Sequence, residues 1–318
     1  MSSATGWMRA SPLPDPVLVT GAGGQLGRAL LATAPRTAAV RGLTRAALDI
    51  CDETALARCL DREQPHLLIN AAAYTAVDKA EEEPAAAHRI NADAPRLLAR
   101  LCAERDIRLV HVSTDFVFDG EQGHPYAPGA PARPLGVYGA SKLAGEVAVR
   151  EAGGNTLIVR TGWVYSAGSG NFLGTMLRLH RERDELRVVA DQVGTPTAAA
   201  SLAHALWAAA ARPAIAGVYH YSDAGACTWY DFAVAIGEEA QAAGLLAAPA
   251  HVQPITTADY PTPARRPAYS VLDKTATWRD FDLEPQHWRA WLRATIAGAA
   301  ADPASSTEQR ARETGAHG

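Results

Sequence analysis

Short apolar runs alternate with amphipathic stretches along the first half of the chain. The apolar, β-rich runs lie at residues 17–20, 67–70, 109–113 and 157–160. Stretches with helical spacing lie between them, at residues 28–34, 54–63, 84–104 and 141–150. Strands that alternate with helices in this way are typical of a parallel, doubly wound sheet, so the predicted fold class is α/β.

The pattern loosens after about residue 163, where helices are predicted at residues 171–183, 198–211 and 229–243, before a proline-rich stretch at 254–267. Ligands of open α/β sheets bind beyond the carboxyl ends of the strands, so this part is expected to form a smaller substrate-binding cap. The predicted division is a Rossmann-type dinucleotide-binding domain over 17–162 and a mainly substrate-binding domain over 163–301, some segments of which return to the first. Residues 1–16 and 302–318 are small and polar and are expected to be flexible tails.

Composition narrows the functional classes. The chain has 318 residues, 48% of them hydrophobic, which is enough for a well-buried core, and its formal net charge of -4 offers no basic surface for nucleic acid. It has no apolar leader at its N-terminus and no run of about 18 apolar residues, which predicts a cytoplasmic protein without a membrane partner. The four cysteines, Cys51, Cys59, Cys102 and Cys227, lack zinc-ligand spacing and are expected to be reduced and structural.

A glycine-rich turn joins the first predicted strand to the first predicted helix. Gly21, Gly24 and Gly27 are spaced as G-x-x-G-x-x-G, and glycines let the backbone approach a pyrophosphate at a helix N-terminus. Such turns also end strands for structural reasons, but the strand and helix context favours a dinucleotide site. The acidic residue that binds a ribose 2′-hydroxyl is expected roughly 20 residues after the turn, but the next predicted strand ends at residues 42–45, where Arg45 stands instead. An arginine pairs with a 2′-phosphate, so NADPH is favoured over NADH, although Arg45 also fits a surface role.

Tyr138 and Lys142 form the Tyr-x-x-x-Lys pattern, which places both side chains on one face of a helix. An ammonium one turn from a phenol is expected to lower the pKa of the phenol from its usual value of about 10, so that tyrosine acts as an acid near neutral pH. The alternative is that the two residues are only neighbours on a solvated helix and have no role in catalysis. Because Lys79 and Lys274 are the only other lysines, a coincidental pairing is disfavoured.

Thr114 stands at the end of the strand predicted at 109–113, where its hydroxyl can hydrogen-bond a substrate carbonyl or simply cap a turn. With Tyr138 and Lys142 it predicts a carbonyl reductase. Hydride passes from a nicotinamide to the carbonyl carbon, Tyr138 donates the proton, Lys142 anchors the ribose and Thr114 polarises the carbonyl.

The glycine turn, residues 70–78, residues 113–120 and the Tyr-x-x-x-Lys pair together resemble the extended short-chain dehydrogenase/reductases. Residues 160–165, 171–177, 191–197 and 260–267 are more narrowly similar to the dTDP-4-dehydrorhamnose reductase family, over about residues 17–295. The resemblance implies NADPH-dependent reduction of the C4 ketone of dTDP-4-dehydro-L-rhamnose to dTDP-L-rhamnose, the last step of an activated-sugar pathway.

The resemblance assigns residues to roles by matching positions. The catalytic residues are Thr114, Tyr138 and Lys142, and the sugar nucleotide contacts Thr114, Asp115, Tyr138 and Trp163. The indole of Trp163 suits a sugar platform, or equally a place in the core. Tyr138 and Lys142 are expected to contact the cofactor as well. The resemblance also places these residues along the cofactor: Gly24, Gln25, Leu26, Asp49, Ile50, Ala73, Tyr74 and Thr75.

Several alternatives stay open at this point. Phe116 follows Asp115 where a dehydratase needs a second carboxylate, so elimination of water is disfavoured, whereas the epimerases are harder to exclude. A reductase of another nucleotide-linked ketosugar is the main rival, and a non-catalytic NADP-binding regulatory subunit is a weaker one. Arg265 and Arg266 suit a clamp on the substrate diphosphate, or two exposed arginines.

Some family members dimerise through a magnesium ion held by carboxylates on two helices. The corresponding residues here are Ala29 and Ala200, which offer no acidic oxygen to a hard cation. The sequence therefore predicts no metal site, and a monomer or a weak homodimer that no metal bridges.

Overall fold

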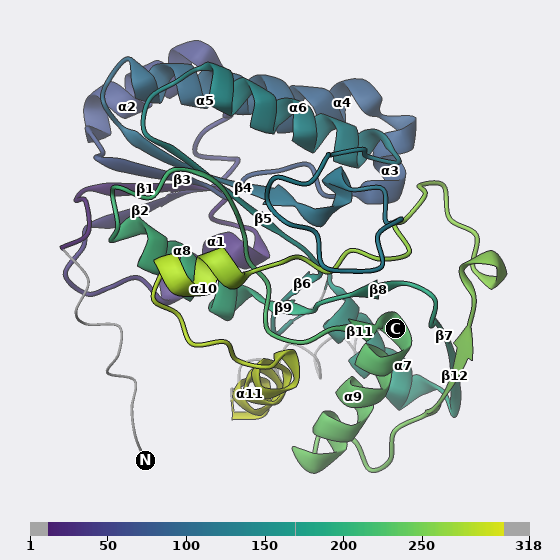
Figure 1. Ribbon diagram of the computed structural model, residues 1–318. Helices are drawn as coiled ribbons and strands as arrows, with labels where there is room; N and C mark the ends of the chain where they lie inside the picture. The colour runs from purple at the N-terminus through teal and green to yellow at the C-terminus, as the bar shows by residue number, and fades with distance from the viewer. Residues whose placement is uncertain (1–11, 169, 302–318) are drawn as a thin grey trace, which may run out of the picture.

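The structure, a computed structural model, describes residues 12–168 and 170–301 (Figure 1). Its centre is a six-stranded sheet with the order β10-β5-β4-β3-β1-β2, in which every neighbouring pair is parallel. The strands are β1 (Val17–Thr20), β2 (Val40–Leu43), β3 (Leu67–Asn70), β4 (Arg108–Thr114), β5 (Thr156–Thr161) and β10 (Gly217–His220). The α/β class and the four predicted strands are confirmed, whereas β10 was not predicted.

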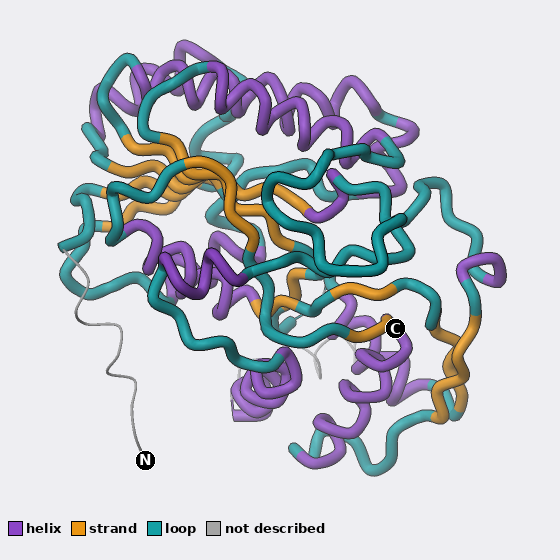
Figure 2. The backbone as a smooth tube through the Cα atoms, in the orientation of Figure 1, coloured by secondary structure: helices purple, strands orange, loops and turns teal. Residues whose placement is uncertain are grey.

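Helices cover both faces of the sheet, which explains why its central strands are nearly continuous apolar runs (Figures 1 and 2). One face carries α2 (Glu53–Glu63), α5 (Ala94–Ala103) and α6 (Val137–Glu151), and the other carries α1 (Gln25–Ala32), α8 (Ala199–Ala210) and α10 (Thr275–Asp280). Along β1 the side chains alternate between two cores. Val17 and Val19 pack with Leu30 of α1, whereas Leu18 packs with Leu56 of α2.

The single helix predicted at 84–104 is three consecutive segments, α4 (Pro84–His88), the π-helical turn η2 (Arg89–Asp93) and α5. Pro95 has no amide hydrogen to donate to the carbonyl of Asn91, so the regular ladder of hydrogen bonds cannot run through this point. Gly145 of α6 lies against the same place, since a Cβ there would be 2.1 Å from the Asn91 carbonyl oxygen.

Helix α6 begins at Val137, earlier than the predicted start at residue 141. The short helix α3 (Val77–Glu82) explains the difference, because its Glu81 Oε1 accepts a hydrogen bond from the Val137 amide at 2.8 Å. The first turn of α6 therefore contains Tyr138.

The second half of the chain builds a smaller core from α7 (Phe172–Glu182), α9 (Trp229–Ala242) and α11 (Trp288–Ala301). The three helices predicted there correspond to α7, α8 and α9, whereas α11 and the small strands were not predicted. The parallel pair β7 (Glu185–Val189) and β12 (His251–Ile255) lies beside this core, and two further pairs are β8 (Val193–Gly194) with β11 (Cys227–Thr228) and β6 (Val164–Tyr165) with β9 (Thr197–Ala198). Helix α8 packs on α1, and β10 joins the six-stranded sheet. Parts of the second half of the chain therefore belong to the domain that the first half builds. A domain boundary near residue 162 stays a prediction.

The two predicted tails differ in what the structure describes. Residues 1–11 and 302–318 lie outside the described residues. Leu13 packs against the core, and the Pro16 carbonyl accepts a hydrogen bond from the His66 amide at 2.9 Å, so the prediction of a flexible tail that continues to residue 16 is wrong.

In the part of the chain that is described, no helix is long and apolar enough to cross a bilayer.

Candidate active site

A cleft of about 1250 Å³ opens at the carboxyl ends of the central strands, facing the second half of the chain. It brings together residues from the glycine turn, the end of β4, α6 and the aromatic residues of the second half. The predicted site residues that line it are Gly21, Gly24, Gln25, Leu26, Arg45, Asp49, Ile50, Ala73, Thr75, Thr114, Asp115, Tyr138, Lys142 and Trp163. Gly27 and Tyr74 are not among its lining residues.

The glycine turn has the geometry that a pyrophosphate site requires. Gly21 has a φ of +70°, and a Cβ there would lie 2.6 Å from the Ala72 amide nitrogen. Helix α1 starts after Gly24 with no side chain capping its N-terminus, so its first amides are available to an anion. Gly27 lies behind the turn, where a Cβ would be 2.2 Å from the Gly21 carbonyl oxygen, so it allows close packing of helix on turn. The turn therefore fits the diphosphate of a dinucleotide.

The end of the cleft near β2 carries several arginines. Arg45 is exposed just beyond β2 and lines the cleft, a position that fits both a contact with a 2′-phosphate and a surface role. Asp49 accepts a hydrogen bond from the Cys51 amide at 3.0 Å and pairs with Arg89 at 3.5 Å. Arg28 and Arg89 also line the cleft and were missed. Arg89 lies on η2, so only the fold brings it to this place.

Tyr74 differs from its predicted role. Its hydroxyl donates to Glu83 at 2.9 Å, so the phenol is held outside the cleft. Its backbone is fixed by Asn91, whose Oδ1 accepts from the Tyr74 amide at 2.8 Å and whose Nδ2 donates to the Tyr74 carbonyl at 3.0 Å. Asn91 Nδ2 also donates to Ser141 of α6 at 3.0 Å. Asn91 thus ties the cofactor loop to the helix of Tyr138, a function that its place in an apparently regular helix hid from sequence reasoning.

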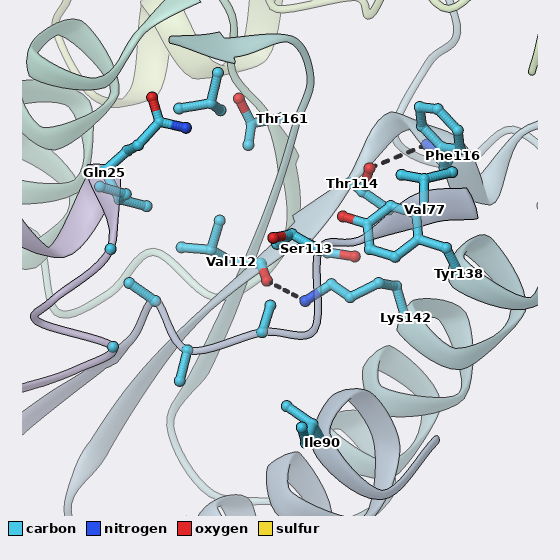
Figure 3. Close-up of a pocket in the computed structure, with 18 of the residues that line it drawn as sticks. Gln25, Val77, Ile90, Val112, Ser113, Thr114, Phe116, Tyr138, Lys142 and Thr161 are labelled. Carbon is cyan, nitrogen blue, oxygen red and sulfur yellow. Dashed lines mark hydrogen bonds between the residues drawn. The ribbon is translucent and has the colours of Figure 1, made fainter. Parts of the chain in front are cut away.

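The reacting centre lies where β4 meets the first turns of α6 (Figure 3). The Thr114 hydroxyl donates to Asp115 at 3.0 Å and accepts from the Phe116 amide at 3.2 Å. The ring of Tyr138 packs edge-on against Phe116, with centroids 5.5 Å apart. The Lys142 ammonium donates to the Val112 carbonyl at 2.7 Å. The three predicted catalytic residues therefore converge at one strand end.

The predicted lowering of the Tyr138 pKa is not found. Burial raises the pKa of the Tyr138 phenol to about 12, and hydrogen bonding to Thr114 only partly opposes this effect. The ammonium of Lys142 is directed to the Val112 carbonyl, and burial lowers the pKa of this lysine to about 8. Burial also raises the pKa of Asp115 to about 6. At neutral pH the phenol is protonated, which is the form that a proton donor needs.

Trp163 lies between two neighbours instead of presenting a free face. Its indole stacks on Trp229 with centroids 3.5 Å apart and planes within 5°. A Cβ on Gly194 would lie 2.5 Å from Trp163 Cε2, and no space remains on the Trp229 side, so Gly194 covers the opposite face. The side chain still lines the cleft, beside Phe172 and Trp229, which sequence reasoning missed, and its contact with a sugar stays a prediction.

Replacing Gly194 by alanine is expected to displace the Trp163 ring, because the stacked Trp229 prevents it from moving away. We expect the KM for the substrate to rise and the free energy of unfolding to fall by about 1–3 kcal/mol, as in other overpacked cores. Steady-state kinetics and urea unfolding measure both quantities. Gly129→Ala is the matched control, since a Cβ there meets nothing within 4 Å. An unchanged KM in Gly194→Ala would show that the position of the Trp163 indole does not shape the substrate site.

The two neighbouring arginines are separated by the fold. Arg266 lines the cleft, and its guanidinium forms an ion pair with Asp78 at 2.7 Å, whereas Arg265 is exposed and is not a lining residue. A clamp made by both arginines is therefore not supported.

Gln25 connects the two halves of the chain, because its Oε1 accepts hydrogen bonds from Ser166 and from Asn171, each at 2.9 Å.

Ala29 and Ala200 lie on α1 and α8, which pack against each other. Among residues 12–168 and 170–301, no three His, Cys, Asp or Glu side chains are grouped to hold a metal ion. The absence of a metal stays a prediction.

The sheet is doubly wound, and the cleft at its edge combines a glycine turn that fits a diphosphate with a Tyr-x-x-x-Lys pair that faces a strand-end threonine. This combination defines a nicotinamide-dependent oxidoreductase of the extended short-chain dehydrogenase/reductase class. The sequence model of the RmlD substrate binding domain matches residues 15–300. The chain belongs to this family, and several of its relatives are named dTDP-4-dehydrorhamnose reductase.

Two such reductases illustrate the similarity. The enzyme of Burkholderia thailandensis is 45% identical over 283 residues, covering 86% of this chain and 95% of the relative. That of Streptomyces griseus is 46% identical over 291 residues, covering 89% and 93%. The crystal structure of the Bacillus anthracis reductase in complex with NADP has a TM-score of 0.85 at 34% identity, covering 90% of this chain and all of that one.

Proposed function

We propose that this enzyme reduces the C4 ketone of dTDP-4-dehydro-L-rhamnose to dTDP-L-rhamnose with NADPH. The observation that carries the proposal is the convergence of Thr114, Tyr138 and Lys142 in the cleft that the glycine turn also lines. The names of the close relatives support the substrate, and the NADP complex of the Bacillus anthracis reductase supports the cofactor.

The residues of the cleft divide the chemistry among them. NADPH, when bound through the glycine turn, supplies the hydride for the carbonyl carbon. The protonated Tyr138 phenol donates to the carbonyl oxygen, and the Thr114 hydroxyl hydrogen-bonds the same oxygen as negative charge develops on it. The Lys142 ammonium holds the nicotinamide ribose and stabilises the tyrosinate that remains. Asp115 and Trp163, which also line the cleft, would contact the sugar.

Arg45 is proposed to select NADPH over NADH by pairing with the 2′-phosphate. Because Arg45 is exposed, we expect Arg45→Ala to lower kcat/KM for NADPH by only about tenfold, the value of one charge-assisted hydrogen bond, and to leave kcat/KM for NADH unchanged. Steady-state kinetics with both cofactors measure this. Arg58→Ala, at an exposed position of α2 outside the lining residues, is the control. Equal losses with both cofactors would refute the assignment.

The function is tested by following NADPH oxidation by the purified protein with dTDP-4-dehydro-L-rhamnose, in a buffer that contains EDTA. Turnover with this substrate is the expected result. Turnover with a different nucleotide-linked 4-ketosugar alone would favour the rival reductase. Binding of NADPH without turnover of any ketosugar would favour a regulatory subunit.

We propose a monomer, or a weak homodimer that needs no metal, because the positions of Ala29 and Ala200 offer no carboxylate. Sedimentation in the same EDTA buffer tests this oligomeric state, and dissociation caused by EDTA would contradict it.

A cytoplasmic location is proposed from the four free thiols, and cell fractionation tests it.

A further inference from the structure

A buried ion pair lies directly behind the catalytic face of α6. Glu146 follows Lys142 by one helical turn and Tyr138 by two, so the three side chains share one face of the helix. The Glu146 side chain is 0% exposed and that of its partner Arg160 is 4% exposed. The pair is bidentate, with Nε to Oε1 at 2.8 Å and Nη2 to Oε2 at 2.7 Å.

The same carboxylate holds the strand that ends in Thr114. Ser113 donates its hydroxyl to Glu146 Oε1 at 2.5 Å. Ser113 of β4 and Arg160 of β5 face each other in the sheet register, and the next pair is Thr114 with Thr161, both of which line the cleft. Glu146 therefore joins α6 to two strands at the residues just before their cleft ends.

Burying these two charges is costly, so packing alone does not explain them. An ion pair taken out of water is often no more stabilising than apolar residues of the same size. Arg160 is further satisfied by the Pro128 carbonyl at 3.1 Å and by the ring of Phe118 at 5.1 Å. His220 Nε2 lies 3.4 Å from Arg160 Nη1, but burial lowers the pKa of His220 to about 3, so this histidine is neutral.

The charges that act on Lys142 are few. Burial is the main cause that lowers the pKa of Lys142, and the negative charge of Glu146 opposes it. His111 of β4 is buried nearby, and burial and Lys142 together lower its pKa, so it is neutral at physiological pH. Tyr138 is protonated. Among residues 12–168 and 170–301, Glu146 is thus the one carboxylate found to favour the charged form of this lysine.

We propose that Glu146 is a positioning residue for ketone reduction: held by Arg160 and Ser113, it fixes α6 against the end of β4 and keeps the Lys142 side chain an ammonium. The inference rests on the proposed function, since its consequence for catalysis requires that Lys142 act there. Its electrostatic part does not need turnover and can be measured directly.

The direct measurement uses the small number of lysines. With lysine labelled at its ε-carbon, NMR titration follows only Lys79, Lys142 and Lys274, and Lys142→Met assigns the resonance of interest. We expect Glu146→Gln to lower the pKa of Lys142 by about one unit, as the loss of a close opposite charge does. Glu151→Gln, an exposed carboxylate at the end of the same helix, should leave it unchanged. An unchanged Lys142 titration in Glu146→Gln would overturn the proposal whatever happens to activity.

Kinetics provide the second readout. Because a lowered lysine pKa removes the ammonium at lower pH, we expect the alkaline fall of kcat in Glu146→Gln to move to lower pH by the same amount, with little change in the KM for the sugar nucleotide.

Since Glu146→Gln leaves Arg160 unpaired and can impair folding, the double variant Glu146→Met/Arg160→Met keeps the test valid by replacing the pair with apolar side chains. The alkaline fall of kcat should stay at the lower pH in the double variant as well. Recovery of the wild-type pH profile in the double variant would show that the pair contributes only to packing and would overturn the proposal. If the wild type turned over no ketosugar, the proposed function would fail while the lysine titration could still be read.

Discussion

Replacing Tyr138 by phenylalanine is expected to lower kcat for ketone reduction by about 10²–10⁴-fold, the usual loss when a positioned general acid is removed. The ring packs edge-on against Phe116 and remains in the variant, so only the hydroxyl beside Thr114 is lost. We therefore expect the fold and the affinity for NADPH to stay unchanged. NADPH oxidation at saturating substrate measures kcat, and fluorescence titration measures cofactor binding.

Tyr219→Phe is the matched control, because its hydroxyl donates to Asp280 of α10 at 2.9 Å, outside the cleft lining. That variant should keep its kcat. The wild-type pH profile adds a further check: burial raises the pKa of Tyr138 to about 12, so loss of the phenol proton cannot limit kcat below that pH. A loss of less than tenfold in Tyr138→Phe would mean that another group, or water, protonates the product.

Local patterns were enough to predict the elements that form the floor of the cleft. The apolar runs of β1, β3, β4 and β5 and the glycine turn depend on neighbours in the sequence, so their types were predicted correctly. Strand β10 was missed because Gly217–His220 is half-buried and weakly apolar, and only its pairing with β5 makes it a strand. The contact of Arg266 with Asp78 joins residues 188 positions apart, which no local pattern reveals.

The spacing of residues identified the members of the site better than their environments. Tyr-x-x-x-Lys gives a shared helix face, but the direction of the Lys142 ammonium depends on the Val112 carbonyl of β4, the strand on which α6 packs. Trp163 was singled out, but the covering of both its faces depends on Trp229 and Gly194 from other elements. Burial, which sets the pKa values of Tyr138 and Lys142, is likewise a property of the assembled fold.

Replacing Lys142 by methionine is expected to change activity and stability in opposite directions. The side chain is 2% exposed, and burial lowers the pKa of Lys142 from its ordinary 10.5 to about 8. A base with a lowered folded-state pKa destabilises the native state at every pH below about 8, here by about 3 kcal/mol, and this effect disappears as the pH rises past 10.5. Methionine has a similar shape and no charge, so the free energy of unfolding at neutral pH should rise by up to about this amount, less the lost hydrogen bond to Val112.

Activity should fall, because the same charge is proposed to hold the ribose and to stabilise the tyrosinate. We expect kcat/KM of Lys142→Met to drop by about 10²–10³-fold, the usual effect of removing one preorganised electrostatic contact. Urea unfolding as a function of pH and steady-state kinetics measure the two effects. Lys274→Met is the matched control, because Lys274 is also buried, with its pKa lowered to about 8, but it donates to Ser222 and to the Asp223 carbonyl and is not a lining residue of the cleft. That variant should change stability and keep kcat/KM within a few-fold. If Lys142→Met gained stability and kept its activity, the buried charge would have no catalytic role, and the proposed function would need another group to hold the cofactor ribose.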